Sequence, residues 1–263
     1  MTETAHPIAA SKVPLVREMH MGDMGFALRA GFADFWRKPM MGLFFSHVYV
    51  VGGWLLYVFF FVTDQIWWAI PITVGFPLLG PFLAVGLYEV SRRLEAGQTE
   101  WRRNDILGVI WRQRLRQLPS MAWVIIVYFL FWSFFAHMLF ALFLGPSALT
   151  NVTTSYAYLL QREGLAMMLV GSAFGAVFAL VLFCLTAVSL PLLLDKELDF
   201  VTAMLTSVAV VRRNPGVMLA WGLTIAGLSF LGMVPGLLGL FVVLPVLGHA
   251  TWHIYRRALQ PQD

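Results

Sequence analysis

Six long apolar runs, none with a charged side chain in its middle, constrain this chain more than any other feature of its sequence. A helix needs about 20 mostly apolar residues to cross the hydrocarbon core of a bilayer. The runs cover residues 40–62, 66–90, 120–144, 165–194, 216–233 and 236–255. The fourth run is so long that it requires a tilt, a kink or a protruding turn. The sequence therefore predicts an all-α integral membrane protein with six transmembrane helices.

The composition excludes a water-soluble globular domain. Charged residues make up 12% of the chain, against about 25% in soluble domains, and the mean hydropathy is +0.76. We expect residues 1–20 to form a flexible cytoplasmic tail, residues 21–258 a single membrane domain, and residues 259–263 a C-terminal tail.

Basic residues are distributed unequally among the segments that flank the runs. Of the 18 Lys and Arg residues, only Arg162 lies in a segment that the six-run plan puts outside. Cytoplasmic segments of membrane proteins carry the excess of Lys and Arg. We therefore expect both termini in the cytoplasm, and the basic balance of the chain needs no nucleic-acid partner to explain it.

A pattern of basic residues followed by proline recurs before the first, third and fifth runs. Proline is favoured in the first turn of a helix, and a segment with helical spacing of apolar residues precedes each proline. The prolines are Pro39, Pro119 and Pro215, and the segments are residues 24–35, 106–116 and 199–213. The pattern predicts three parallel repeats of an interfacial amphipathic helix followed by a transmembrane hairpin. The alternative is that these features are common to membrane helices in general.

The second cytoplasmic connection is the richest in arginine. Cations on an interfacial helix bind anionic lipid headgroups. We expect this role for Arg102, Arg103, Arg112, Arg114 and Arg116.

Histidines are the ionisable residues that lie deepest in the runs. His47 and His249 lie at similar expected depths, and a haem of the b type needs histidines on two helices. His249 and His253 have the i, i+4 spacing by which a helix presents two metal ligands. The other interpretation is hydrogen bonding between helices, which is the usual use of a membrane histidine. We favour that interpretation and expect no cofactor, with haem b as the alternative.

Small residues at four-residue spacing mark helix packing. Gly171 and Gly175 in the fourth run, and Gly222 and Ala226 in the fifth, allow helices to approach closely. No catalytic motif accompanies them, and no run has a carboxylate at its centre, which disfavours ion-coupled transport. We assign no catalytic residues.

The closing segment LPVLGHATWHIYRR, residues 244–257, resembles the C-terminal signature of a proteobacterial family of predicted integral membrane proteins of unknown function. Residues 80–93 and 213–215 fit the same family, and the resemblance extends over about residues 20–258. Some members carry the label of putative cytochrome c oxidase proteins. The resemblance implies a multi-pass protein of the bacterial inner membrane and an association with respiratory membranes.

The function that these features favour is that of a non-catalytic accessory, assembly or scaffold component of a membrane complex, with the lipid bilayer and subunits of a respiratory or other complex as partners. The alternative is a transporter or channel for a neutral or lipidic solute. A hydrated cavity near residues 77–81 and 245–249 would favour transport, and a sealed bundle with an exposed apolar flank would favour the accessory role.

Overall fold

The computed structural model describes residues 12–58, 69–98, 100–144 and 162–261, with the backbone alone at residues 69–81, 140 and 144. In chain order the elements are β1 (Leu15–Val16), α1 (Met21–Arg37), α2 (Pro39–Tyr57), α3 (Ala69–Glu95), α4 (Arg103–Gln113), α5 (Leu118–Leu144), α7 (Arg162–Thr186), α8 (Ser189–Asp195), α9 (Phe200–Arg213), α10 (Pro215–Met233), α11 (Leu240–Ala258) and β2 (Leu259–Gln260). Apart from two short strands, the elements are helices.

Four helical segments are long and apolar enough to cross a membrane. They are Pro39–Tyr57, Leu118–Phe143, Arg162–Asp195 and Pro215–Met233. They coincide with the first, third, fourth and fifth expected spans. Among the described residues, α3 and α11 do not meet the same criterion, and ionised residues occupy the last turns of both helices. The six-span arrangement therefore stays a prediction for these two helices.

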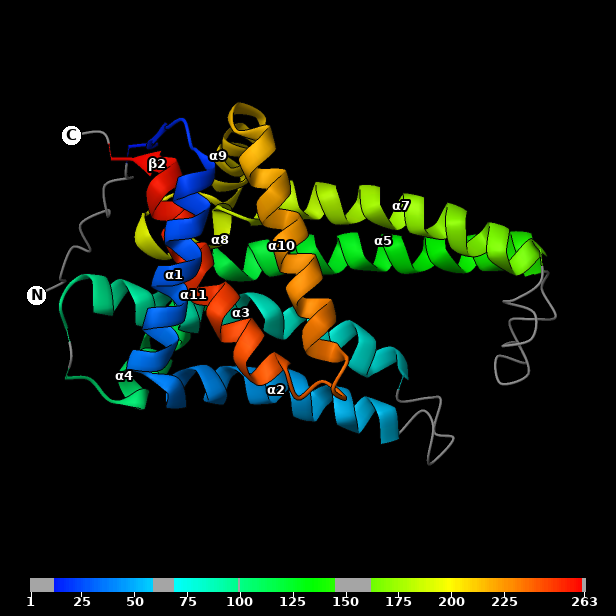
Figure 1. Ribbon diagram of the computed structural model, residues 1–263, viewed down its shortest axis with the longest axis horizontal. Helices are drawn as coiled ribbons and strands as arrows, with labels where there is room; N and C mark the ends of the chain where they lie inside the picture. The colour runs from blue at the N-terminus through cyan, green and yellow to red at the C-terminus, as the bar shows by residue number, and fades with distance from the viewer. Residues whose placement is uncertain (1–11, 59–68, 99, 145–161, 262–263) are drawn as a thin grey trace, which may run out of the picture.

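The helices form a compact body at one end of the molecule, from which long hairpins project (Figure 1). The α5–α7 pair runs side by side away from this body, and α2 and α3 extend in the same direction. The helices α10 and α11 cross the molecule obliquely, with α1 packed along α11. Both ends of the described chain lie at the body.

The structured region extends into both segments that we expected as tails. β1 and β2 pair antiparallel, with Leu15 opposite Gln260 and Val16 opposite Leu259. The amide of Asn214 donates to the carbonyl oxygen of Arg17 at 2.9 Å, and its carbonyl accepts from the backbone N–H of Met19 at 2.8 Å. The two ends are therefore fastened to each other and to the start of α10.

The expected proline starts are confirmed at two helices. Pro39 and Pro215 are the first residues of α2 and α10, where a missing N–H breaks no helical hydrogen bond. The helix α9 begins differently, because the side chain of Asp199 accepts a hydrogen bond from the backbone N–H of Thr202 at 2.9 Å. The hydroxyl and the N–H of Thr202 lower the pKa of Asp199 by hydrogen bonding to its charged form.

The fourth expected span, whose length requires a tilt, a kink or a protruding turn, is broken near its end. α7 stops at Thr186 and α8 starts at Ser189, and Pro191 cannot donate a backbone hydrogen bond to the preceding turn. The backbone N–H of Val188 instead donates to the hydroxyl of Ser207 on α9 at 3.1 Å. The break turns α8 into the interior of the body.

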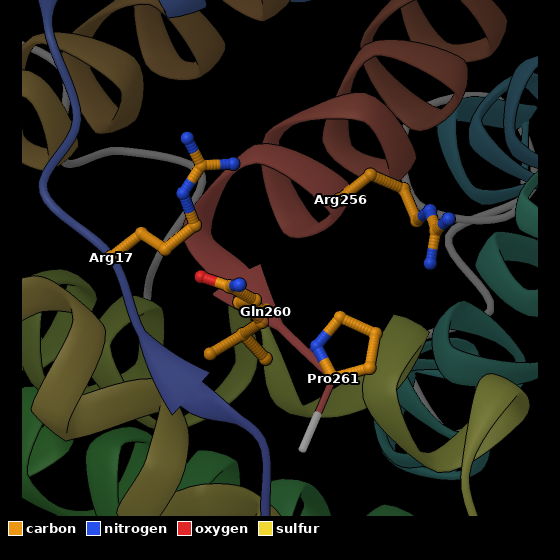
Figure 2. A pocket seen from close by; sticks show the side chains of 5 residues that line it. Arg17, Arg256, Gln260 and Pro261 are labelled. Atoms are coloured by element: carbon orange, nitrogen blue, oxygen red, sulfur yellow. The ribbon is translucent and has the colours of Figure 1, made fainter. Parts of the chain in front are cut away.

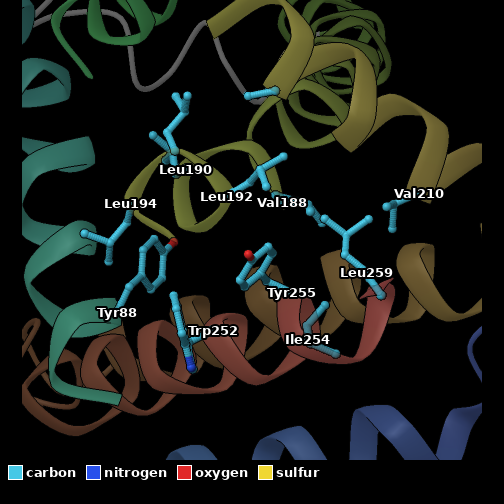
Figure 3. Packing of buried hydrophobic residues seen from close by; sticks show 14 of the residues in the cluster. Tyr88, Val188, Leu190, Leu192, Leu194, Val210, Trp252, Ile254, Tyr255 and Leu259 are labelled. Atoms are coloured by element: carbon cyan, nitrogen blue, oxygen red, sulfur yellow. The ribbon is translucent and has the colours of Figure 1, made fainter. Parts of the chain in front are cut away.

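The hydrophobic core surrounds α8 (Figure 3). Leu190, Leu192 and Leu194 of this helix are buried against side chains of α3, α9 and α11. Burying a leucine contributes about 1.5–3 kcal/mol relative to leaving it in water. Tyr88 and Tyr255 both lie beside this short helix in Figure 3, and α3 and α11 both contact it.

Candidate functional site

Polar side chains, some of them buried and some exposed, meet where α1, α3, α8 and α11 converge. We call this set the polar junction; its members are Asp34, Glu89, Ser91, Arg92, Arg93, Glu95, Asp195, His249, Trp252, His253, Tyr255 and Arg256. A buried polar group costs free energy unless it is hydrogen-bonded. The partners of each member therefore show what the junction can do.

The bond between Ser91 and His249 joins α3 to α11. The Ser91 hydroxyl oxygen lies 2.8 Å from Nδ1 of His249, and both residues have no exposed surface. Nε2 of the same ring is buried and has no hydrogen-bond partner among the described residues. The histidine thus lies in a dry position that links two helices.

The bond between Asp34 and His253 joins α1 to α11 in the same way. A carboxylate oxygen of Asp34 lies 2.8 Å from Nε2 of His253, and Asp34 is buried. Close approach of the two helices makes this contact possible, because a Cβ at Gly31 would lie 2.5 Å from the backbone nitrogen of Ala250. Only glycine fits at residue 31 without moving the backbone of α11.

A fully buried carboxylate lies at the end of α3. Glu89 has no exposed surface and accepts hydrogen bonds from Arg92 at 2.7 and 3.0 Å and from Arg93 at 2.6 Å. Hydrogen bonds between ionised partners are short and strong. The arginines one turn away thereby neutralise the charge of Glu89.

The end of α11 is tied to α3 and α8 through two further carboxylates. Glu95 accepts hydrogen bonds from the indole N–H of Trp252 at 2.9 Å and from Arg256 at 3.0 Å. The hydroxyl of Tyr255 donates to Asp195 at 2.6 Å. Each carboxylate of the polar junction therefore has a hydrogen-bonded partner, an arrangement that supports helix packing rather than proton transfer.

The structure gives the three candidate ligand histidines different partners. His47 is exposed, and its Nδ1 contacts the carbonyl of Phe44 in its own helix, whereas His249 is buried against α3. Within the described residues, these two histidines bond to different groups. His249 and His253 bind Ser91 and Asp34 respectively, and the described residues contain no group of three or more His, Cys, Asp or Glu side chains that could hold a metal ion. The haem and metal assignments stay predictions.

The small residues singled out in the sequence lie on open or loosely packed surfaces. A Cβ at Gly171 would have no heavy atom within 4 Å, and one at Gly175 would lie 3.4 Å from Trp132. A Cβ at Gly222 would lie 3.6 Å from Phe183, and Ala226 is exposed. Among the described residues, a Cβ at any of these three glycines would thus lie no closer than 3.4 Å to another helix.

The close approaches occur at other glycines. Besides Gly31, a Cβ at Gly86 would overlap the ring of Phe45, and one at Gly248 would lie 2.5 Å from Leu87. The sequence did not predict the close contacts at these three glycines. The signal for Gly31 was available, because Ala27, Gly31 and Asp34 share one helical face, but the buried partner on α11 is 219 positions from Asp34.

The five candidate headgroup arginines have different environments. Arg102, Arg103 and Arg112 are exposed; the Arg114 guanidinium lies 3.2 Å from the centre of the Trp111 ring, and Arg116 forms an ion pair with Glu197. Arg102 and Arg103 alone among the five line a groove of about 910 Å³ at the start of α2. The remaining lining residues are Met40, Met41, Leu43, Phe44, His47 and Phe241.

A second hollow, of about 370 Å³, lies where the two chain ends meet (Figure 2). Arg17, Arg256, Leu259, Gln260 and Pro261 line it. Arg256 is already paired with Glu95 at 3.0 Å. This hollow therefore presents a shallow polar surface beside the β1–β2 pair.

Long apolar helices joined to a body that holds a network of paired charges define a multi-pass helical membrane protein. Residues 69–195, which span α3 to α8, match the model of a family described as predicted integral membrane protein (DUF2189). The match supports the resemblance to an integral membrane protein family. No curated protein and no solved structure matches the chain.

Proposed function

We propose that this protein is a non-catalytic accessory, assembly or scaffold component of a complex in the bacterial inner membrane. The observation that carries the proposal is the apolar flank of the α5–α7 hairpin. Phe134 on α5 is 71% exposed and Leu169 on α7 is 75% exposed, far from the polar junction along the hairpin. Large exposed apolar surfaces mark contact with lipid or with protein.

The face of α7 favours a protein partner over lipid alone. Gly171 is open, and the neighbouring small residues Ser172, Ala176 and Ala179 are exposed. Small residues let a second helix approach closely, which is how helices associate in a bilayer. We infer that a helix of a partner subunit packs on this face.

The proposal includes a topology that goes beyond the four apolar helices. We infer six spans, with α3 and α11 as the second and sixth, three repeats of an interfacial helix and a hairpin, and both termini in the cytoplasm. The unequal distribution of Lys and Arg supports this orientation. The family label of some relatives favours a respiratory complex as the assembly.

Purification of the tagged full chain in a gentle detergent tests the accessory role. We expect a partner in fixed stoichiometry, and we expect Gly171→Leu to remove it without lowering the yield of the chain. Gly227→Leu is the matched control, because a Cβ at Gly227 on α10 also has nothing within 4 Å. Recovery of the chain alone in every preparation would contradict the proposal.

A second candidate function, a transporter or channel for a neutral solute, has one observation in its favour. A cavity of about 250 Å³ lies between α2, α3, α10 and α11, and Ser46, Tyr49, Ser229 and Thr251 contribute hydroxyl groups to its lining. Ligand pockets usually measure about 300–1,000 Å³, so the cavity suits a small solute. Swelling of proteoliposomes in glycerol that slows in the Ser229→Phe variant would support this candidate over the first.

A further inference from the structure

We propose that the groove at the start of α2 is a binding site for one anionic phospholipid, with its phosphate on Arg102 and Arg103 and an acyl chain along α2. The inference does not depend on the accessory role. It requires only that α2 lies in a membrane.

The walls of the groove are suited to a hydrocarbon chain. Met40 and Leu43 of α2 are exposed, Met40 by 72%, and Phe44 and Phe241 complete the apolar lining. The stretch from Met40 to His47 spans about 10 Å of helix. Apolar side chains in such an open groove are unfavourable in water, and an acyl chain removes them from it.

The polar end of the groove lies beside the start of α2. The ammonium group of Lys38 lies 4.8 Å from the centre of the Trp101 ring. Lys38 directly precedes α2 and Trp101 directly precedes Arg102, so this contact brings Arg102 close to the start of α2. The guanidinium of Arg103 lies 5.4 Å from the centre of the Phe44 ring. The cations thus lie where the span begins, at the depth of lipid headgroups.

Phe241 marks the apolar end of the groove. Its carbonyl oxygen lies 3.4 Å from the hydroxyl of Ser46, which is two turns along α2 from Pro39. Charge at one end and apolar side chains toward the other reproduce the arrangement of a phospholipid in one leaflet.

The charges of Arg102 and Arg103 are available for a ligand. Among the described residues, neither guanidinium has a carboxylate within 4.0 Å, whereas other arginines of the body are paired. Asp105 is the nearby acid; its carboxylate accepts from the backbone N–H of Arg102 at 2.7 Å. Arginine side chains bind phosphate oxygens through two parallel hydrogen bonds.

An anionic phospholipid accounts for both halves of the groove. A soluble anion leaves the apolar wall exposed, and a neutral lipid leaves two arginines without a counter-charge. Attraction of each basic residue to an anionic leaflet contributes about 1 kcal/mol. In the groove, contact between the apolar wall and the acyl chain adds to this electrostatic attraction.

Displacement of a fluorescent phosphatidylglycerol from the purified full chain in detergent micelles tests the proposal. We expect dioleoylphosphatidylglycerol to compete at least tenfold better than dioleoylphosphatidylcholine. The double variant Arg102→Gln/Arg103→Gln should lose at least tenfold in affinity. Leu43→Glu, on the apolar wall, should lose a similar factor while both arginines remain.

The matched control is Arg112→Gln/Arg114→Gln, which removes the same charge from the same helical segment outside the groove. We expect it to bind phosphatidylglycerol within about twofold of the parent chain. Equal losses in the two double variants would overturn the proposal in favour of general surface attraction. Competition by glycerol 1-phosphate as strong as by the lipid would overturn it in favour of a soluble anion.

All variants are compared by their elution profile and melting temperature. The substituted arginine side chains are exposed and form no ion pair with a described carboxylate, although Arg103 and Arg114 contact the rings of Phe44 and Trp111. We therefore expect the fold to persist. Retention of phosphatidylglycerol by a folded Arg102→Gln/Arg103→Gln variant at the affinity of the parent chain would contradict the site.

Discussion

The contact of α1 with α11 and the projecting hairpin α5–α7 show two ways in which the same kind of apolar helix is used. At the first, Gly31 brings the backbones together and Asp34 forms a buried bond to His253. On the second, Gly171 has nothing within 4 Å and aromatic side chains face outward. The first surface is completed within the chain, and the second leaves its small residues for a molecule outside it.

This difference separates residues that hold the fold from residues that face lipid or a partner. Buried polar bonds in α1, α3 and α11 give the body specific partners, because an unpaired polar group there is costly. The hairpin lacks this requirement, since the side chains that it exposes are largely apolar. Mutations should therefore have large effects on stability in the body and small effects on the hairpin.

The largest effect is expected for Gly31→Leu. A Cβ at this position lies 2.5 Å from a backbone nitrogen of α11, so the helices must separate and the Asp34 bond to His253 must break. We expect a loss of about 3 kcal/mol or more, the upper part of the range for overpacking. Thermal unfolding in detergent, followed by circular dichroism, measures it. Unchanged stability would mean that α1 does not pack on α11 in this way.

The next effect is expected for Glu89→Ala. Removal of the buried carboxylate leaves Arg93 without its partner, and breaking a buried pair costs about 3–5 kcal/mol. The side chains of Arg92 and Arg93 still reach solvent, so we expect a smaller loss of about 2 kcal/mol. Chemical denaturation of the purified chain checks the value, with Glu100→Ala in the following loop as an exposed control. A loss no larger than that of the control would contradict a structural role for Glu89.

A moderate effect with a defined pH dependence is expected for Asp199→Ala. Loss of an N-cap costs about 1 kcal/mol. Because folding lowers the pKa of Asp199, its contribution is complete above the ordinary pKa of aspartate and disappears as the pH falls through the lowered value. The difference in melting temperature between the variant and the parent chain should therefore be present at pH 7 and shrink in acid.

Asp199→Asn provides the control for this prediction, because asparagine also caps a helix but carries no charge. It should keep most of the stability and show no acid-dependent change. An equal difference between Asp199→Ala and the parent chain at neutral and acidic pH would show that the carboxylate does not cap α9.

The smallest effect is expected for Gly171→Leu, the same substitution as in the first prediction but on the hairpin. The new side chain meets no atom of the chain within 4 Å of its Cβ. We expect a change in unfolding free energy within about 0.5 kcal/mol, as for most surface substitutions. A loss of unfolding free energy close to that of Gly31→Leu would contradict the difference proposed between the α1–α11 contact and the α5–α7 hairpin.

Part of the fold followed from local signals in the sequence. Pro39 and Pro215 marked helix starts. The length of the fourth run left a tilt, a kink or a protruding turn open, and the structure has a break between α7 and α8. The partners of the histidines did not follow, because Ser91 and Asp34 lie 158 and 219 positions from His249 and His253. The spacing of residues in the sequence does not show which distant helix faces His249 or His253.

For the groove at the start of α2, the sequence indicated the arginines but not the cavity. Arg102 and Arg103 were expected at lipid headgroups from their charge and position. Nothing in the local pattern distinguished them from Arg112 and Arg114. The groove requires the first turns of α2, the start of α4 and Phe241 of α11 together, and no single segment contains it.

By itself, the sequence determined that this is a helical protein of the membrane, and it located four helices that are long and apolar enough to cross one. Apolar composition over about 20 residues is a local property, and the cost of exposing it to water leaves few alternatives. Only the tertiary structure decided which glycines bring helices together and which charges of the described residues are paired. Those outcomes depend on the packing of segments more than 100 positions apart, as the bond between Asp34 and His253 shows.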